Sequence, residues 1–341
     1  MKTIDANIYW IPDELFTDRS LRDEFTECIP REYDTHAFYY TNEDGDEAIR
    51  IEKPLGCENL NYFRSDYQLE KQLADMNEAG IDMAVMKLPG CAEWLNLRLC
   101  RIFNDAAAKH AKESGGRLKA FAVVPPYADE GCIQELDRCV KELGMTGVQM
   151  SAHYGNHYLD DEMFRGILRH INDLNIPIYV HHTPIPVDYQ SIFEYNNLRR
   201  SFGRCEDQVT AIGRELFSGM FEELPNLKMI HSMLGGAYFA FKEMLMPRDS
   251  GGGRFSVNNE KVRKWLDSNI YFELSHAAPW GKELLECAVK ILGADHIIYG
   301  SSYPVKKVWL TEGAGFVKNL DIDQSQKQLI LYDNAKKIYK L

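Results

Sequence analysis

The first ten residues, Met1-Lys-Thr-Ile-Asp-Ala-Asn-Ile-Tyr-Trp10, contain a short segment in which polar and apolar side chains alternate. Alternation with a period of two is typical of a buried β-strand, and Ile11-Pro12 ends the segment. The period places three polar residues on one face (Asp5, Asn7, Tyr9) and three apolar residues on the other (Ile4, Ala6, Ile8). We therefore predict that the chain opens with the first strand of an α/β fold.

From residue 65 onward, apolar segments of strand length alternate with amphipathic segments of helix length. The strands expected after the first one cover residues 81–88, 118–124, 147–150, 176–182, 227–233, 270–274 and 296–299. Strands that alternate with helices form a parallel sheet with right-handed crossovers, and eight such repeats favour closure into a barrel. The predicted fold is an α/β protein with a (β/α)8 TIM barrel, one domain over residues 1–341 whose active site lies at the carboxyl ends of the strands.

Two stretches depart from this alternation. Residues 11–64 are polar, mix aromatic and acidic side chains, and show no sustained period. We predict that they form a long insertion after the first strand, as a cap over one mouth of the barrel. Residues 249–258 are rich in glycine and serine, which predicts a flexible loop.

Composition excludes several classes of partner. The net charge of the 341-residue chain is −12, which argues against binding to nucleic acid or to acidic membrane surfaces. No apolar run approaches the ~18 residues of a membrane span, and the first residues lack the pattern of a signal peptide. The eight cysteines are scattered without a C-x-x-C pair, as expected for reduced thiols. We predict a cytoplasmic protein with no nucleic-acid and no membrane partner.

Eight segments in order resemble the amidohydrolase superfamily, in the branch of α-amino-β-carboxymuconate-ε-semialdehyde decarboxylase and the resorcylate decarboxylases. They are Gln72-Leu-Ala-Asp-Met-Asn-Glu-Ala-Gly-Ile-Asp82, Phe121-Ala-Val-Val-Pro-Pro126, the segment from Glu135-Leu to Glu142-Leu-Gly-Met-Thr-Gly-Val-Gln149, Leu159-Asp-Asp-Glu-Met-Phe164, Pro177-Ile-Tyr-Val-His181, Pro225-Asn-Leu-Lys228, Leu234-Gly-Gly236 and Tyr299-Gly-Ser-Ser-Tyr-Pro304. Together the segments span nearly the whole chain apart from the insertion at 11–64. Each segment is weak alone, but the series is specific for the fold and the branch.

The resemblance also implies where a metal ion would bind. In that family one metal, typically zinc, is held by His-x-His at the end of strand 1, a histidine after strand 5 and an aspartate after strand 8. Here the two strand-1 positions are Asn7 and Tyr9, the aspartate position is Ser302, and His181 alone remains. An amide, a phenol and a hydroxyl with one imidazole are poor ligands for zinc. We therefore predict no metal at the family position, with a single divalent ion such as zinc as the fallback.

Four histidines are candidates for general acid–base catalysis. His181 is the first, because barrel geometry and the resemblance both place it at the mouth. Strand periodicity puts residues 229, 231 and 233 on one face, so His231 is expected to point into the barrel one layer below Met233. His153 follows the fourth strand and His276 follows the seventh. Each of these histidines has the alternative of a packing role, and no G-x-S-x-G, P-loop or G-x-G-x-x-G motif offers another mechanism.

The remaining candidate residues would contact a substrate. Asn7, Tyr9 and Ser302 would supply neutral hydrogen bonds at the positions where relatives have metal ligands. Met233 takes the place of the family's acid–base histidine after strand 6. Lys87, at the end of the second strand, either binds a substrate carboxylate or extends its ammonium group outwards to solvent.

Two functions stay open at this point. The favoured one is an enzyme of the decarboxylase-like branch, a lyase or a hydrolase, that works without the usual zinc. The resemblance implies a small carboxylic acid, aromatic or unsaturated, as its substrate. The alternative is a catalytically inactive barrel that serves as a binding or scaffold subunit, because a fold does not determine a function. We expect a homodimer.

Overall fold

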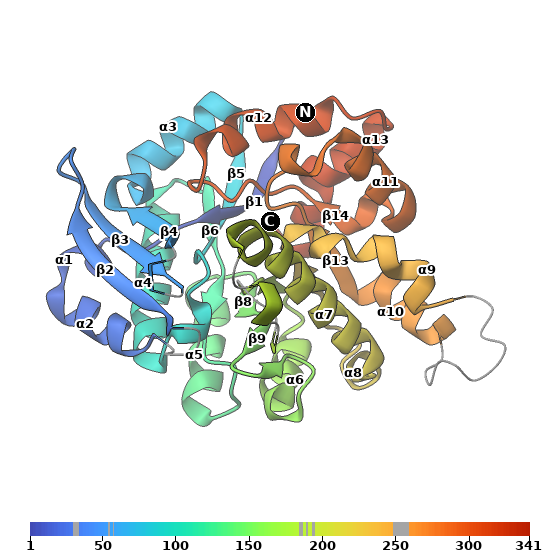
Figure 1. Ribbon diagram of the computed structural model, residues 1–341, viewed down its shortest axis with the longest axis horizontal. Coiled ribbons are helices and arrows are strands. Elements are labelled where there is room, and N and C mark those ends of the chain that lie inside the picture. Colours follow the sequence, from blue (N-terminus) through green and yellow to red (C-terminus); the bar gives the residue numbers. More distant parts are fainter. Residues whose placement is uncertain are drawn as a thin grey trace.

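The structure is a computed structural model that describes residues 1–29, 34–53, 55–56, 58–183, 187–188, 190–192, 195–247 and 259–341. The loop expected at 249–258 lies outside the described residues. Figure 1 shows a set of parallel strands surrounded by helices, with the first and last segments of the chain close together. Among the described residues, none of the helices combines the length and apolar character that crossing a membrane requires.

The barrel strands follow the predicted order. They are β1 (Ile4–Tyr9), β5 (Met83–Lys87), β6 (Leu118–Ala120) with β7 (Ala122–Val123), β8 (Val148–Ser151), β11 (Ile178–His181), β12 (Met229–His231), β13 (Ile270–Glu273) and β14 (Ile297–Ile298). Neighbouring barrel strands pair in parallel, in the order β1-β5-β6 and in the order β7-β8-β11-β12-β13-β14. β6 and β7 are two halves of one strand, interrupted at Phe121, whose N–H donates to the carbonyl of Met86 at 3.3 Å.

Backbone hydrogen bonds close this sheet into a ring. The N–H of Ala6 donates to the carbonyl of Tyr299 at 2.9 Å, and the N–H of Ser302 donates to the carbonyl of Asn7 at 2.8 Å. These bonds join the end of β14 to β1, so the first and last strands are neighbours. The predicted (β/α)8 barrel is confirmed.

Helices cover the outside of the barrel. They are α3 (Leu69–Ala79), α4 (Leu97–Glu113), α5 (Glu130–Lys141), α6 (Arg165–Leu174), α7 (Gly203–Phe217), α8 (Met220–Glu223), α9 (Lys242–Leu245), α10 (Asn259–Asn269), α11 (Lys282–Leu292), α12 (Lys307–Lys318), α13 (Gln324–Gln328) and α14 (Asn334–Ile338). Their ends carry ordinary capping residues: the side chain of Asn96 accepts the N–H of Leu99 at the start of α4, and Gly80 ends α3 with a φ of 65°.

Short elements fill the connections. The two-residue strands β9 (His153–Tyr154) and β10 (His157–Tyr158) form a hairpin after β8. Single helical turns are η2 (Arg64–Tyr67), η3 (Ala92–Trp94), η4 (Glu162–Phe164), η5 (Gln190–Ile192), η8 (Ala278–Trp280) and η9 (Ala294–His296), while η6 (Leu198–Phe202) and η10 (Leu329–Asp333) are π-helical and η7 (Met233–Phe241) is an irregular segment after β12.

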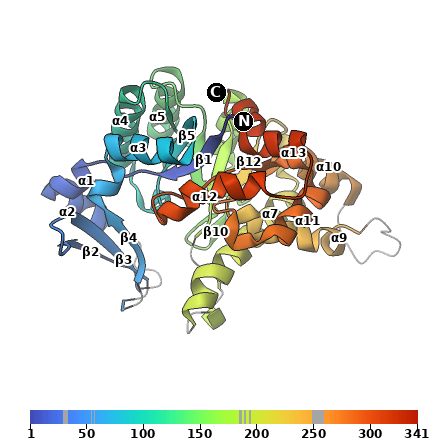
Figure 2. The same ribbon diagram turned by 90° about the horizontal axis from the view of Figure 1, so that it is seen from above.

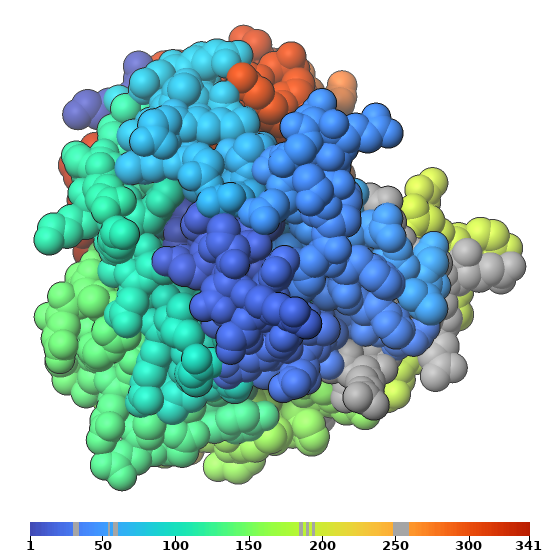
Figure 3. Space-filling view, turned by 90° about the vertical axis from the view of Figure 1, so that its left-hand side faces the viewer, coloured from blue at the N-terminus to red at the C-terminus, as the bar shows by residue number. Residues whose placement is uncertain are grey.

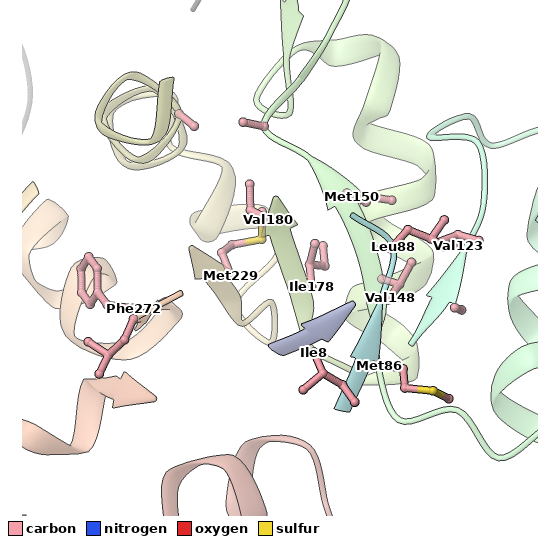
Figure 4. Close-up of a cluster of buried hydrophobic side chains, with 14 of the residues drawn as sticks. Ile8, Met86, Leu88, Val123, Val148, Met150, Ile178, Val180, Met229 and Phe272 are labelled. Atoms are coloured by element: carbon pink, nitrogen blue, oxygen red, sulfur yellow. The ribbon is translucent and has the colours of Figure 1, made fainter. Parts of the chain in front are cut away.

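Two layers of apolar side chains hold the barrel. The outer layer lies between strands and helices and includes Ile8, Val148 and Met229 (Figure 4). The inner layer brings together side chains of the strands and of the C-terminal segment. The strand residues are Ile4, Ala6, Val85, Tyr179, Ile230 and Ile298, with Phe121 between β6 and β7, and the C-terminal residues are Ala335 and Tyr339. The pairing of β1 with β5 shifts register between Asp5 and Ile8. Because of this bulge, Ile4 and Ala6 point into the barrel below Asn7, so the predicted strict alternation along β1 is wrong.

The insertion at 11–64 is ordered where it is described. It contains α1 (Glu14–Thr17), α2 (Arg19–Glu27) and a three-stranded antiparallel sheet of β2 (His36–Thr41), β3 (Glu47–Glu52) and β4 (Glu58–Phe63). Figures 1 and 2 place this sheet at one flank of the barrel, and Figure 3 shows that flank from outside. The hydroxyl of Tyr62 donates to the carbonyl of Pro89 at 2.6 Å, which ties the sheet to the segment after β5. Its role as a cap stays a prediction.

Candidate active site

A buried pair of side chains joins opposite strands at the carboxyl ends of the barrel. The hydroxyl oxygen of Tyr9, on β1, lies 3.1 Å from Nε2 of His181, on β11. Nδ1 of the same imidazole lies 2.7 Å from the carbonyl oxygen of His182, which can only accept. Nδ1 therefore carries the hydrogen, and Nε2 accepts the hydroxyl of Tyr9. Burial lowers the pKa of His181 to about 3, so its imidazole is neutral.

The other strand-end positions converge on the same place. Nδ2 of Asn7 lies 3.2 Å from Oε2 of Glu273 and 3.2 Å from the hydroxyl of Ser302. Oδ1 of Asn7 is buried without a hydrogen-bond partner within the described part of the chain. The structure therefore brings together Asn7, Tyr9, Ser302 and His181, as expected for a shared site. Whether these residues contact a substrate stays a prediction.

Glu273, at the end of β13, is a central acceptor that we did not single out from the sequence. Its carboxylate also accepts the hydroxyl of Tyr179 at 2.9 Å and the hydroxyl of Ser275 at 3.0 Å. Burial raises the pKa of Glu273, and the charge of Lys87 opposes that rise. The backbone N–H of Met233 donates to the same Ser275 hydroxyl at 2.8 Å, which places the Met233 backbone beside the site.

Lys87 lies below this layer, inside the barrel. Its ammonium group donates to the carbonyl of Ala6 and lies 4.0 Å from the centre of the Tyr179 ring. Burial lowers the pKa of Lys87, and Glu273 and Asp5 oppose that change. The alternative in which Lys87 extends outwards to solvent is wrong, because the residue is buried. Its role in binding substrate stays a prediction.

The structure places His231 outside the barrel. Its Nδ1 lies 2.8 Å from Oε1 of Gln208, and its Nε2 lies 2.9 Å from Oε2 of Glu215, both on α7. The neighbouring Ile230 belongs to the inner layer instead. The expectation that His231 points into the barrel is therefore wrong, because the side chain of β12 that points inwards is that of Ile230.

His153 and His276 occupy different surroundings. Nε2 of His153 lies 2.5 Å from the hydroxyl of Thr183 and 3.4 Å from Oδ1 of Asp207, in a separate buried network. The ring of His276 stacks on Trp309 with centres 4.4 Å apart. Burial lowers the pKa of His276 to about 4, and the charge of Arg204 adds to that effect.

Arg204 is a further residue that sequence reasoning did not single out. It follows the first residue of α7, and burial lowers the pKa of its guanidinium to about 10. Its charge lowers the pKa values of Tyr9, His181, His182 and His276, which come from different elements of the barrel mouth. The available signal was the cluster of basic residues at 199, 200 and 204, where a helix follows the strand-5 loop.

The donors at this site do not suit the metal ion that the family implies. No group of three His, Cys, Asp or Glu side chains able to share an ion occurs among the described residues. The one imidazole nitrogen, on His181, already accepts Tyr9, and the Glu273 carboxylate is engaged by Tyr179 and Ser275. Zinc and manganese sites use several imidazole or carboxylate ligands with an open position. The residues present do not fit such an ion.

Comparisons with known proteins show which proteins this chain resembles. Gamma-resorcylate decarboxylase from Polaromonas sp. is 24% identical over 289 residues, which are 80% of this chain and 87% of that protein. 2-Amino-3-carboxymuconate-6-semialdehyde decarboxylase from Dictyostelium discoideum is 26% identical over 246 residues, which are 70% of this chain and 66% of that protein. These two relatives are decarboxylases, which confirms the predicted branch and agrees with the prediction of an enzyme.

A solved structure and a family model complete the comparison. Dihydroxybenzoic acid decarboxylase from Polaromonas sp., determined with bound manganese and the inhibitor 2-nitroresorcinol, has a TM-score of 0.74 at 19% identity, and the match covers 100% of this chain and 97% of that one. The model of the amidohydrolase family matches residues 70–341. Since this match spans well over half of the sequence, the chain belongs to the amidohydrolase family.

Proposed function

We propose that the protein is a lyase that decarboxylates a small aromatic or unsaturated carboxylic acid without the metal ion of its relatives. The observation that carries this proposal is the buried Tyr9–His181 pair at the carboxyl ends of β1 and β11. The decarboxylase activity of the sequence relatives supports the choice of reaction. The poor fit of the donor set to a divalent ion supports the absence of metal.

Decarboxylation replaces a carbon–carboxylate bond by a carbon–hydrogen bond, so the site has to deliver one proton to carbon. The hydroxyl of Tyr9 is the proposed donor, and the proton moves from its oxygen to the carbon that bears the carboxylate. Carbon dioxide then leaves, and the electron pair of the broken bond returns to the substrate. A solvent proton restores the hydroxyl of Tyr9.

The neighbours of Tyr9 have complementary roles in this proposal. Burial raises the pKa of Tyr9, while hydrogen bonds from Ser302 and Asn7 favour its ionised form. The two groups therefore stabilise the negative charge that appears on the phenol oxygen as the proton leaves. His181 is neutral and holds the hydroxyl in position through Nε2, so it acts as the orienting acceptor.

The test is an assay of carbon dioxide release from a panel of hydroxybenzoates, with elemental analysis of the same protein prepared without chelators. We expect turnover without a stoichiometric transition metal, a loss of about 100-fold or more in Tyr9→Phe and His181→Ala, and wild-type turnover in the matched variant Tyr238→Phe. Full activity in Tyr9→Phe would show that Tyr9 is not the proton donor. A stoichiometric metal whose removal stops turnover would overturn the metal-free part.

The inactive scaffold predicted as the alternative has its own outcome in this test. A folded protein that turns over none of the acids, yet associates stably with itself or a partner, favours that alternative. The homodimer and the cytoplasmic location stay predictions from the sequence. Sedimentation of the purified protein tests the first of them.

A further inference from the structure

We propose that a cavity in the insertion binds a small zwitterion such as an α-amino acid, with the carboxylate of the ligand on Arg22 and its ammonium group on Glu47. The inference does not depend on the proposed function, because the cavity belongs to the insertion and not to the strand ends. Three features carry it: the size and walls of the cavity, the guanidinium of Arg22, and the carboxylate of Glu47.

The cavity lies between the helices and the sheet of the insertion, and its volume is about 140 Å³. Phe16 of α1 and Arg22 of α2 line it on the helix side, while β2 and β3 line it on the sheet side. Figures 1 and 3 show these helices beside the sheet at the flank of the barrel. A cavity of about 150 Å³ is enough for a molecule of benzene, so the space suits a ligand of about six heavy atoms.

The sheet register directs the polar side chains of β2 and β3 to this space. Thr41 pairs with Glu47 across the two strands, so both side chains lie on one face of the sheet. Tyr39 lies two positions before Thr41 and shares that face. Arg22 of α2 contacts the ring of Tyr39, which shows that the face is turned towards the helix.

The guanidinium of Arg22 stacks on an aromatic ring and has no acid to pair with. Its central carbon lies 5.1 Å from the centre of the Tyr39 ring. In the described part of the insertion Arg22 has no carboxylate partner. The other arginines described there do have one: Arg19 pairs with Asp23, Arg50 with Glu52, and Arg64 with Asp13. A guanidinium stacked through its face keeps the N–H donors at its edge, where they can hold both oxygens of a carboxylate.

The carboxylate of Glu47 keeps part of its capacity to accept hydrogen bonds. Its Oε2 accepts Nη1 of Arg64 at 3.0 Å, while Nε and Nη2 of that arginine donate to Asp13 at 2.6 and 2.8 Å. A carboxylate has about four acceptor positions, and one arginine shared between two acids does not cancel both charges. Glu47 can therefore accept a charged donor from the cavity.

The two charged side chains select the class of ligand. A simple anion would pair with Arg22 but meet the like charge of Glu47, and a simple cation would meet the opposite problem. A zwitterion places each of its charges against the opposite charge of the protein. An α-amino acid with a small side chain has this pattern and about the heavy-atom count that the cavity can hold.

The experiment is a titration followed by the backbone amide resonances of Thr41 and Ala48, which line the cavity. The compounds are L-alanine, L-alaninamide, which lacks the carboxylate, and propionate, which lacks the ammonium group. We expect L-alanine to bind about tenfold more tightly than L-alaninamide, because charge-assisted bonds to the guanidinium are strong. Its advantage over propionate should be about threefold, because Glu47 is partly exposed to water.

Variants assign each end of the ligand. Arg22→Met should bind L-alanine about tenfold more weakly than the wild type, and Glu47→Gln should bind L-alanine and propionate alike. The matched control is Arg50→Met, because Arg50 also stacks on an aromatic ring of the insertion, Phe38 at 5.3 Å, but pairs with Glu52 at 3.0 Å. This variant should match the wild type.

Arg22→Lys keeps the charge but loses the fork, so we expect it to bind L-alanine several-fold more weakly than the wild type. This variant decides the question if Arg22→Met does not fold. Resonances that do not shift in the wild type, equal affinity for the three compounds, or wild-type affinity in the Arg22 variants would each overturn the inference. Because none of these measurements uses turnover, they stand whether or not the protein is a decarboxylase.

Discussion

The hydroxyl oxygen of Tyr9 lies 3.1 Å from Nε2 of His181, although 172 positions of the chain separate the two residues. The contact joins strands on opposite sides of the barrel, and both side chains are buried. The carbonyl of His182 accepts a hydrogen bond from Nδ1 of His181, so Nε2 carries no hydrogen. The Tyr9 hydroxyl therefore donates its hydrogen bond to Nε2.

Replacing Tyr9 by phenylalanine leaves a buried acceptor without its donor. We expect Tyr9→Phe to lower the free energy of unfolding by about 1–3 kcal/mol, the usual cost of an unsatisfied buried group. The control is Tyr238→Phe, because the Tyr238 hydroxyl is buried without a partner among the residues described. Urea denaturation of both variants checks this, and an equal loss in the two would show that the Tyr9–His181 bond adds no stability.

The buried charges of Glu273 and Lys87 depend on each other. Glu273→Gln removes one of the two carboxylates whose charge acts on the ammonium group of Lys87, the other being Asp5, so we expect a loss of unfolding free energy of at most about 3–5 kcal/mol. The double variant Glu273→Gln/Lys87→Met removes the stranded charge and should recover much of that loss. Denaturation of the two single variants and the double variant measures the coupling. Additive losses would mean that the two charges do not interact.

Asp5 predicts a specific dependence of stability on pH. Burial raises the pKa of Asp5 from 3.8 to about 6. The folded state therefore holds this proton more tightly than the unfolded state, and the resulting stability is present below about pH 4 and lost as pH rises through 6. A shift of two units corresponds to about 3 kcal/mol.

The Asp5→Asn variant has no carboxyl group at this position. Relative to the unfolding free energy of the wild type, that of the variant should therefore rise by up to about 3 kcal/mol between pH 4 and pH 7.5. Denaturation series at several pH values measure the difference, and titrating groups remote from Asp5 cancel in it. Parallel curves for the two proteins would show that Asp5 has an ordinary pKa.

Gly236 allows the segment after β12 to pack against the backbone of α7. Gly236→Ala forces a side chain against the backbone of Cys205 at a positive φ, so we expect a loss of more than about 2 kcal/mol of unfolding free energy. The matched control is Gly213→Ala in the middle of α7, where nothing lies within 4 Å and alanine should stabilise the helix by about 0.5–1 kcal/mol. Thermal unfolding and calorimetry check both, and a harmless Gly236→Ala would contradict the packing argument.

Local patterns predicted the barrel well. The strands expected at 118–124 and 270–274 correspond to β6 with β7 and to β13. A barrel strand packs against helices on one face and against the barrel core on the other, so it is mostly apolar along its length. The strands of the insertion were missed for a physical reason. The residues of β2 from 36 to 40 are all half-buried, so neither face of that strand shows the alternation that marks a buried side.

The sequence by itself determined the order of strands and helices, the family, and the placement of Asn7, Tyr9, His181 and Ser302 at one end of a barrel. Periodicity reports which residues are buried, and the carboxyl ends of parallel strands always meet at one edge. Only the tertiary structure decided the register shift in β1, the outward turn of His231, and the position of Glu273 among the site residues. Those features depend on contacts between distant segments, such as the 3.2 Å bond from Asn7 to Glu273, which no local pattern records.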